Sequence, residues 1–553
     1  MLSAVTVFLV RVGASWGRTE YSIWPDEPAQ LAMARFLGGG TSWTMHDHST
    51  WRPAYAALLA PIHWFTSDPA IVFRLALVVN AVLGAVAALL LVVLARRLTS
   101  LGPWGCAAIA VIVSLTPARL FTTDFVWSES LTAAMFLVAL LALLRFWSAP
   151  SRSSGVLLGF AAAAAVGAHS RLLPLVVIAL VVMALAVRRR SLSAVDATIA
   201  AACTVGGLIA VEIATRLIVA QLWRNPTSNN SAGAVADRLT DPGALLLSFA
   251  GQTWYQLVAS AGLIGVGGWV LARNSFASGS DRSTTRVPTR DDARLVGLTV
   301  AACAGLSIAF MAGRLRADQV VYGRYSDVVT APVLLIGLAT LVTAATATTA
   351  RSRVVAAVGI AAATIATAAV TVISRHDALA SSNGLEPMIL GLQPFRGSSD
   401  RIDVFRITVL ALAVGAVLLA TTFLRSRALL AGTIAAFALV VVGDAFTADI
   451  LDREWSGRGG HDAVAELADG PLASGAPVDF LVPAASNSTN RLMLYQMYLP
   501  ESEFTVVEDS SEVASSPLVF APPGDTALDE AGALLLWTDR FGRMSLWDRS
   551  VVR

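Results

Sequence analysis

The sequence contains no lysine and few charged residues of any kind. Of its 553 residues, 14% are charged and 56% are hydrophobic, and the mean hydropathy is +0.66. Because soluble globular proteins carry about 25% charged residues, this composition excludes that class and indicates an integral membrane protein with many spans. The basic residues are all arginine, which, with abundant Ala and Val, is typical of a GC-rich genome such as that of an actinobacterium. The net charge of +2 argues against a nucleic-acid partner.

Cysteine is scarce as well. Cys106, Cys203 and Cys303 lie far apart, each inside an apolar run. This spacing excludes a disulfide framework and a zinc site, so we expect small core residues. The N-terminal run lacks the basic segment and the A-x-A site of a cleavable signal peptide.

Long apolar runs fill the first 446 residues. A transmembrane helix needs roughly 20 apolar residues, and hydropathy predicts about thirteen spans, hence an all-α polytopic bundle. The run 53–65 is interrupted by prolines and His63, so we expect a helix at the membrane surface there. The spans are expected at about 2–17, 69–94, 102–118, 129–147, 155–169, 172–187, 195–222, 254–272, 294–313, 327–347, 354–373, 405–424 and 428–446.

The arginines predict an orientation in the cell (plasma) membrane. Positive charge favours cytoplasmic loops, and arginines gather on alternate loops. This pattern predicts a cytoplasmic N-terminus, and it places Asp26 and everything after residue 447 on the extracytoplasmic side. The loops concerned carry Arg96–Arg97, Arg145 with Arg152, Arg188–Arg190, the stretch 273–294, Arg351 with Arg353, and Arg425 with Arg427.

The composition changes after residue 447. VDFLVP, EFTVVED, PLVFAPP and ALLLWTD are typical of short buried strands, and NRLMLYQMYL is typical of a helix. We therefore expect two domains, a transmembrane domain over 1–446 and a small extracytoplasmic α/β domain over 447–553. Substrate binding, partner docking and simple capping all stay open as the role of the second domain.

The stretch SIWPDEPAQLAMARF places Asp26 and Glu27 directly after the first span. Carboxylates near a membrane are costly unless they are solvated or paired. One interpretation is a solvated pair or a helix N-cap after Pro25. The other is a general base at the membrane surface, where an aqueous acceptor and a lipid-anchored donor can meet.

Three stretches together resemble a known family. They are WPDEPAQLAMARFL after the first span, VFRLALVVNAVLGAVAALLLVVLARRL at 72–98, and YGRYSDVVTAPVLLIGLA at 322–339. In order and spacing they resemble the GT-C superfamily of membrane glycosyltransferases, and most closely the branch with protein O-mannosyltransferases and aminoarabinose transferases. The resemblance covers about residues 1–345. Each motif is weak alone, and their order makes the match more specific.

The resemblance implies a role for particular residues. Asp26 would be the catalytic base, and Glu27 would orient an acceptor or support Asp26. A second outer acid would be Asp124 or Glu129. The donor's lipid phosphate would be bound by arginine forks and a tyrosine, namely Arg324, Tyr325, Arg171 and Arg74. An interfacial anchor pair at Arg324–Tyr325, or simple pairing of Arg171 and Arg74 inside the bundle, are the structural alternatives.

The implied reaction is an inverting transfer of a sugar, mannose or arabinofuranose, from a polyprenyl-phosphate donor to a cell-envelope glycan, lipid or protein. The chain lacks the lumenal insertion of the eukaryotic mannosyltransferases, and its C-terminal domain is not the usual tail of that branch, so sugar and acceptor stay open. The alternatives are a glycolipid flippase, and a non-catalytic subunit of a cell-envelope synthase. A divalent cation (Mg or Mn) stays open too, because His46 and His48 could bind a metal with Asp26 or Asp47.

Overall fold

In the computed structural model of this chain, the described residues are 1–18, 26–40, 45, 51–223, 232–276, 288–313, 317–347, 349–380, 388–396, 402–423, 427–447, 464, 466–468, 470–472, 475–482, 488–507, 516–539 and 544–550. His46, Asp47 and His48 lie outside them, as do Arg314 and Arg316.

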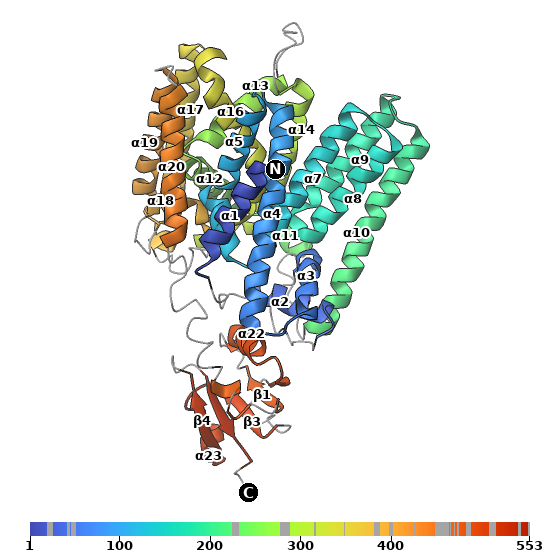
Figure 1. The fold of residues 1–553 in the computed structure, drawn as a ribbon, viewed down its shortest axis with the longest axis vertical. Helices are drawn as coiled ribbons and strands as arrows, with labels where there is room; N and C mark the ends of the chain where they lie inside the picture. Colours follow the sequence, from blue (N-terminus) through green and yellow to red (C-terminus); the bar gives the residue numbers. More distant parts are fainter. Residues whose placement is uncertain are drawn as a thin grey trace.

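Long helices form one bundle, with a small sheet below it in the view of Figure 1. The expected all-α bundle with a small C-terminal α/β part is confirmed. The main helices of the bundle are α1 (Leu2–Ser15), α4 (Pro69–Leu98), α5 (Pro103–Ser114), α6 (Pro117–Phe121), α7 (Glu129–Ser148), α8 (Arg152–Ala168), α9 (Leu173–Arg188), α10 (Ala194–Leu222), α12 (Pro242–Ala259), α13 (Leu263–Phe276), α14 (Arg290–Met311), α15 (Arg324–Val329), α16 (Ala331–Ala347), α17 (Ala350–Ala380), α19 (Val404–Phe423) and α20 (Arg427–Thr447).

Each of the thirteen expected spans coincides with a helix or a bent pair of helices. By length and composition, seven of the described helices can cross a membrane, or ten if each of three bent pairs is one span. The shorter apolar helices α1, α8 and the segment Ala431–Gly443 account for the remaining expected spans. The fold class is therefore right, while the count of thirteen crossings stays a prediction.

The breaks inside two of the expected spans have local causes. The expected span 254–272 is in fact α12 and α13, which meet at 109°. Ala261 and Gly262 have φ of 47° and 84° there, and this left-handed backbone ends a helix. In the first pair Pro117 opens α6 after Thr116, since a proline ring suits the first turn of a helix and not its interior. Hydropathy misses such breaks because the apolar run continues through them.

The segment after the first helix lies inside the fold. α2 (Asp26–Leu37) is buried along most of its length, although its sequence is typical of a surface-lying amphipathic stretch. The apolar run 53–65 forms α3 (Ala54–Leu59) and the short 3-10 helix η1 (Ala60–Trp64), so it is a short helical segment as expected and not a span. Both pack against α2.

The C-terminal part is a five-stranded mixed sheet in the order β2-β1-β3-β5-β4. The strands are β1 (Val478–Leu481), β2 (Phe504–Val507), β3 (Leu518–Ala521), β4 (Leu534–Thr538) and β5 (Ser545–Asp548). β2, β1 and β3 pair in parallel, and β5 pairs antiparallel with β3 and β4. The four expected strands and the expected helix, α22 (Ser488–Tyr498), are present. β5 was not expected, because its short sequence, SLWD, gives a weak alternation signal.

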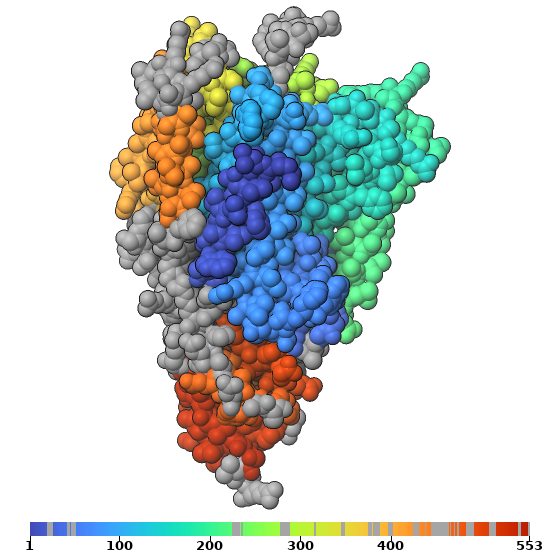
Figure 2. Space-filling view, viewed as in Figure 1, coloured from blue at the N-terminus to red at the C-terminus, as the bar shows by residue number. Residues whose placement is uncertain are grey.

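The sheet is joined to the bundle through α2. Apolar residues of α2, including Leu31 and Met33, belong to the same buried cluster as Leu492 and Tyr495 of α22. At the end of α2, Arg35 donates from Nη2 to the carbonyl oxygen of Pro500 at 2.7 Å. Figure 2 shows the red C-terminal part directly below the blue N-terminal helices. α2 therefore packs against α3 and η1 of the bundle and against α22 of the C-terminal part.

Candidate functional site

Three of the expected residues form one ionic cluster. Arg324 donates from Nη1 to Oδ2 of Asp26 and from Nε to Oε1 of Glu129. The Arg324 and Glu129 side chains are 5% and 2% exposed, whereas that of Asp26 is 20% exposed. A molecule that reaches this cluster from outside therefore meets the Asp26 carboxylate first.

The three residues stand at the beginnings of three helices. Asp26 and Glu129 are the first residues of α2 and α7, where the positive end of the helix dipole stabilises a carboxylate. Arg324 is the first residue of α15, where the same dipole opposes its charge. The two carboxylates offset this unfavourable interaction of Arg324 with the helix dipole. Each of the three charged side chains is therefore stabilised by the others.

The first turn of α15 is fixed by tight packing and buried hydrogen bonds. A Cβ on Gly323 would lie 1.8 Å from the Tyr255 ring, so only glycine fits before Arg324. The Tyr255 hydroxyl donates to Oδ2 of Asp327 at 2.7 Å and accepts from the Gly391 amide at 2.9 Å. Gln256 donates to the other oxygen of Asp327 at 2.7 Å. These bonds hold the turn that presents Arg324.

Aromatic rings stack against the guanidinium groups of Arg324 and Arg171. The Cζ atom of Arg324 lies 3.6 Å from the ring centroid of Trp127, which is 1% exposed. The Trp127 ring is therefore buried beneath a guanidinium. Stacking of this kind stabilises a cation in a partly dehydrated site.

Arg171 and Tyr325 lie beside Arg324 and extend the cluster. The Arg171 Cζ atom lies 3.2 Å from the Tyr325 ring centroid, and the Arg324 Cζ atom lies 5.5 Å from it. Tyr322 stacks on Tyr325 at a centroid distance of 4.7 Å. His169 caps the turn, since its Nδ1 accepts from the Arg171 amide at 3.2 Å. The structure thus brings the expected Arg324, Tyr325 and Arg171 together.

Glu27 points into the protein rather than toward the outside. Its side chain is fully buried, its Oε1 accepts from the Val126 amide at 2.7 Å, and its Oε2 lies 3.8 Å from Nη2 of Arg18. Of the two expected roles, these contacts favour support of Asp26 over orientation of an acceptor. Arg18 also donates from Nε to the carbonyl oxygen of Asp124 at 3.2 Å.

Two expected residues stand apart from the Arg324 cluster. Asp124 is 5% exposed, and its Oδ1 has no hydrogen-bond partner among the described residues. Arg74 is exposed on α4, while its neighbour Phe73 is buried beneath Arg18. Of the two expected second acids, Glu129 is therefore the one that meets Asp26 through a shared partner.

Sequence reasoning gave three further residues of this region no catalytic or phosphate-binding role. Trp51 donates from Nε1 to Oδ1 of Asp26 at 3.1 Å. Arg11 and Arg119 line, with Arg324 and Glu129, a cavity of about 40 Å³ inside the bundle. Nε of Arg11 is buried and has no hydrogen-bond partner in the described part of the chain. A lone arginine in an apolar run was the available signal, because such residues are costly and usually functional.

The cluster combines two chemical capacities. A partly exposed carboxylate can accept a proton from a hydroxyl group. Buried guanidinium groups beside it can stabilise an anion. Within the described ranges, no group of three or more His, Cys, Asp or Glu side chains could hold a metal ion.

Two kinds of comparison gave no match: no family model matches the sequence, and neither does any curated protein. Solved structures do match. ArnT from Cupriavidus metallidurans in the apo state is 15% identical, with 99% of this chain and 97% of that chain covered and a TM-score of 0.57. The same protein bound to undecaprenyl phosphate matches with equal identity and coverage and a TM-score of 0.54. Arabinosyltransferase EmbB from Mycobacterium smegmatis is 15% identical, with 81% of this chain and 40% of that chain covered and a TM-score of 0.44. The likeness to ArnT over nearly the whole chain confirms the expected GT-C fold.

Proposed function

We propose that the protein is a membrane glycosyltransferase that moves a sugar from a polyprenyl-phosphate donor to an acceptor hydroxyl group. The observation that carries the proposal is the arrangement of Asp26, Arg324 and Glu129, in which a partly exposed carboxylate adjoins a buried guanidinium. The GT-C fold supports it, and so does the solved complex of ArnT with undecaprenyl phosphate, since ArnT shares this fold.

In the proposed step, Asp26 accepts the proton of the acceptor hydroxyl group. The hydroxyl oxygen then attacks the anomeric carbon, and the bond from this carbon to the phosphate oxygen breaks, with inversion. The leaving polyprenyl phosphate gains negative charge, and Arg324 and Arg171 stabilise it. Tyr325 and Glu129 position these guanidinium groups, and Glu27 positions α2.

In this proposal Asp26 changes partner during the reaction. It is paired with Arg324 before substrate binds, and a bound phosphate would compete for the same guanidinium. The competition would free the carboxylate for the acceptor, so that the base becomes available when the donor is present. Mannose and arabinofuranose are the proposed sugars, and a cell-envelope glycan, lipid or protein on the extracytoplasmic side is the proposed acceptor.

The second candidate is a glycolipid flippase. Charged residues at mid-span favour transport, and one such group exists: Glu212 accepts from Arg52 at 2.7 Å and from Arg216 at 3.1 Å. These charges pair with one another at one side of the bundle. The acids of the Arg324 cluster begin helices instead, which favours the transferase.

Transfer by the purified protein in lipid tests the proposal. Polyprenyl-phosphate mannose and arabinofuranose are supplied with cell-wall acceptors, and release of polyprenyl phosphate is measured for the wild type and for Asp26→Asn. We expect turnover with one donor, its loss in Asp26→Asn, and retained donor binding in that variant. Absence of turnover, with glycolipid movement equal in both proteins, would instead establish the flippase.

A further inference from the structure

A second cavity lies at the end of the bundle remote from the C-terminal sheet. It has a volume of about 390 Å³, within the range of about 300–1,000 Å³ typical of ligand sites. Four helices, α13, α16, α17 and α19, form most of its wall. None of the residues of the Arg324 cluster lines it, so it is separate from the proposed active site.

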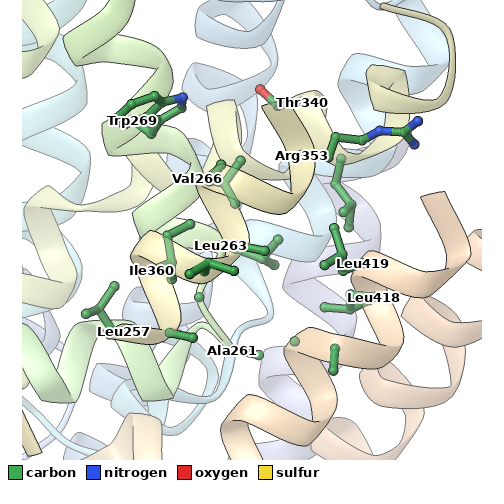
Figure 3. Close-up of a pocket in the computed structure, with 18 of the residues that line it drawn as sticks. Leu257, Ala261, Leu263, Val266, Trp269, Thr340, Arg353, Ile360, Leu418 and Leu419 are labelled. Carbon is green, nitrogen blue, oxygen red and sulfur yellow. The ribbon is translucent and has the colours of Figure 1, made fainter. Parts of the chain in front are cut away.

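This cavity is an open groove, and its lining is divided between an apolar end and a basic end. Figure 3 shows Leu257 and Ala261 at one end, and Trp269, Thr340 and Arg353 toward the other. Arg273 also belongs to the lining. No acidic side chain is among the described residues of the lining. The groove therefore has the polarity of a lipid, with an apolar tail region and a positively charged head region.

Arg353 has unused donor capacity at this end. Its Nη1 donates to the carbonyl oxygen of Thr422 at 2.8 Å, and its Cζ lies 4.5 Å from the Phe423 ring centroid. Its Nε is buried and has no hydrogen-bond partner among the described residues. A buried polar donor without a partner is costly, and a phosphate oxygen would satisfy it.

We propose that this groove binds one anionic phospholipid, with an acyl chain in the apolar end and its phosphate on Arg353. The outer wall of the groove is open to the membrane, because Trp269 and Val358 line it and are 51% and 63% exposed. Basic pockets between transmembrane helices select anionic head groups. The inference does not depend on transferase activity. With the proposed orientation, the lipid comes from the cytoplasmic leaflet.

Native mass spectrometry of the full chain, stripped of lipid and then titrated, tests the assignment. The probes are phosphatidylglycerol and phosphatidylcholine with identical acyl chains. We expect phosphatidylglycerol to be retained at about tenfold lower concentration, because the choline cation of phosphatidylcholine is repelled by Arg353 and Arg273, whereas phosphatidylglycerol carries a net negative charge. Equal retention of the two lipids, or retention of neither, would overturn the proposal; retention of neither would leave the groove to a partner's apolar helix.

Two pairs of variants locate the lipid. Arg353→Gln should remove the preference for phosphatidylglycerol, whereas Arg351→Gln, on the exposed side of the same helix turn, should keep it. Ala361→Phe should fill the groove and reduce retention, whereas Ala363→Phe, exposed and outside the lining, should not. If Arg351→Gln acts as strongly as Arg353→Gln, diffuse charge and not a site attracts the lipid, and the inference fails.

Discussion

Arg324 and Asp26 form an ion pair between segments that lie 298 residues apart in the sequence. The pair joins the first turn of α15 to the first turn of α2, so the two halves of the proposed site depend on each other. It also makes one guanidinium the shared neighbour of the proposed base and of the proposed leaving group.

Replacing Arg324 by glutamine should lower the rate of transfer by about 100- to 1,000-fold, as does the loss of one preorganised donor to a developing anion. Donor binding should weaken as well, because the same side chain holds the phosphate before reaction. Steady-state rates and donor titrations with purified protein measure both effects.

Arg74→Gln provides the comparison. The sequence resemblance implies that Arg74 binds the donor phosphate, whereas the structure places it exposed on α4, apart from the cluster. We expect rates within about twofold of the wild type, as for most surface substitutions. A loss as large as that of Arg324→Gln would mean that the donor lies along α4 and not at the cluster.

Trp51→Phe should reduce turnover by roughly 10-fold while leaving the fold intact. The change removes the Nε1 donor that lies 3.1 Å from Oδ1 of Asp26, and a hydrogen bond to a charged group contributes about 1.5–3 kcal/mol at most. Trp64→Phe, at an exposed ring in η1, should leave turnover unchanged.

Gly323→Ala should destabilise the protein and displace Arg324. The added Cβ would lie 1.8 Å from a ring whose hydroxyl is held by Asp327 and Gly391, so the ring has no room to move. Overpacking of this kind costs about 1–3 kcal/mol. Thermal unfolding in detergent should show a lower midpoint. Gly297→Ala, where a Cβ meets open space, should not lower it.

His63 should make stability depend on pH. Burial, with the Arg35 charge adding to it, lowers the pKa of His63 from 6.5 to about 4. The unfolded chain therefore binds this proton more tightly than the folded one. Its contribution to the free energy of unfolding is full above pH 6.5 and is lost as the pH falls from 6.5 toward 4.

The measurement is the unfolding midpoint of the wild type and of His63→Phe over this pH range. The phenylalanine has no titrating group, so the difference between the two curves should change between pH 6.5 and 4 and stay constant above it. If the two curves stay parallel throughout the range, His63 has the same pKa in the folded and the unfolded protein, and the prediction is wrong.

The sequence by itself determined the class of protein and where its elements lie. Runs of apolar residues must be placed in a membrane or a core, so the bundle and the positions of its helical segments could be read from hydropathy alone. Alternation and short apolar runs likewise placed four of the five strands. The cost of charge beside an apolar run indicated Asp26 and Glu27 as candidates, whereas Arg324 was indicated by the resemblance to the GT-C superfamily.

The tertiary structure alone decided which of these residues meet. Hydropathy is a property of one segment, whereas an ion pair depends on how two segments pack together. Nothing in the sequence of α2 specifies α15 as its partner, and nothing in α15 specifies α2. Hence Glu129 rather than Asp124 shares Arg324 with Asp26, Arg74 stays outside, and Trp127 lies under a guanidinium. The groove beside α12 and α13 depends equally on close contact, such as that of Gly265 with Ile360, which no run of apolar letters reveals.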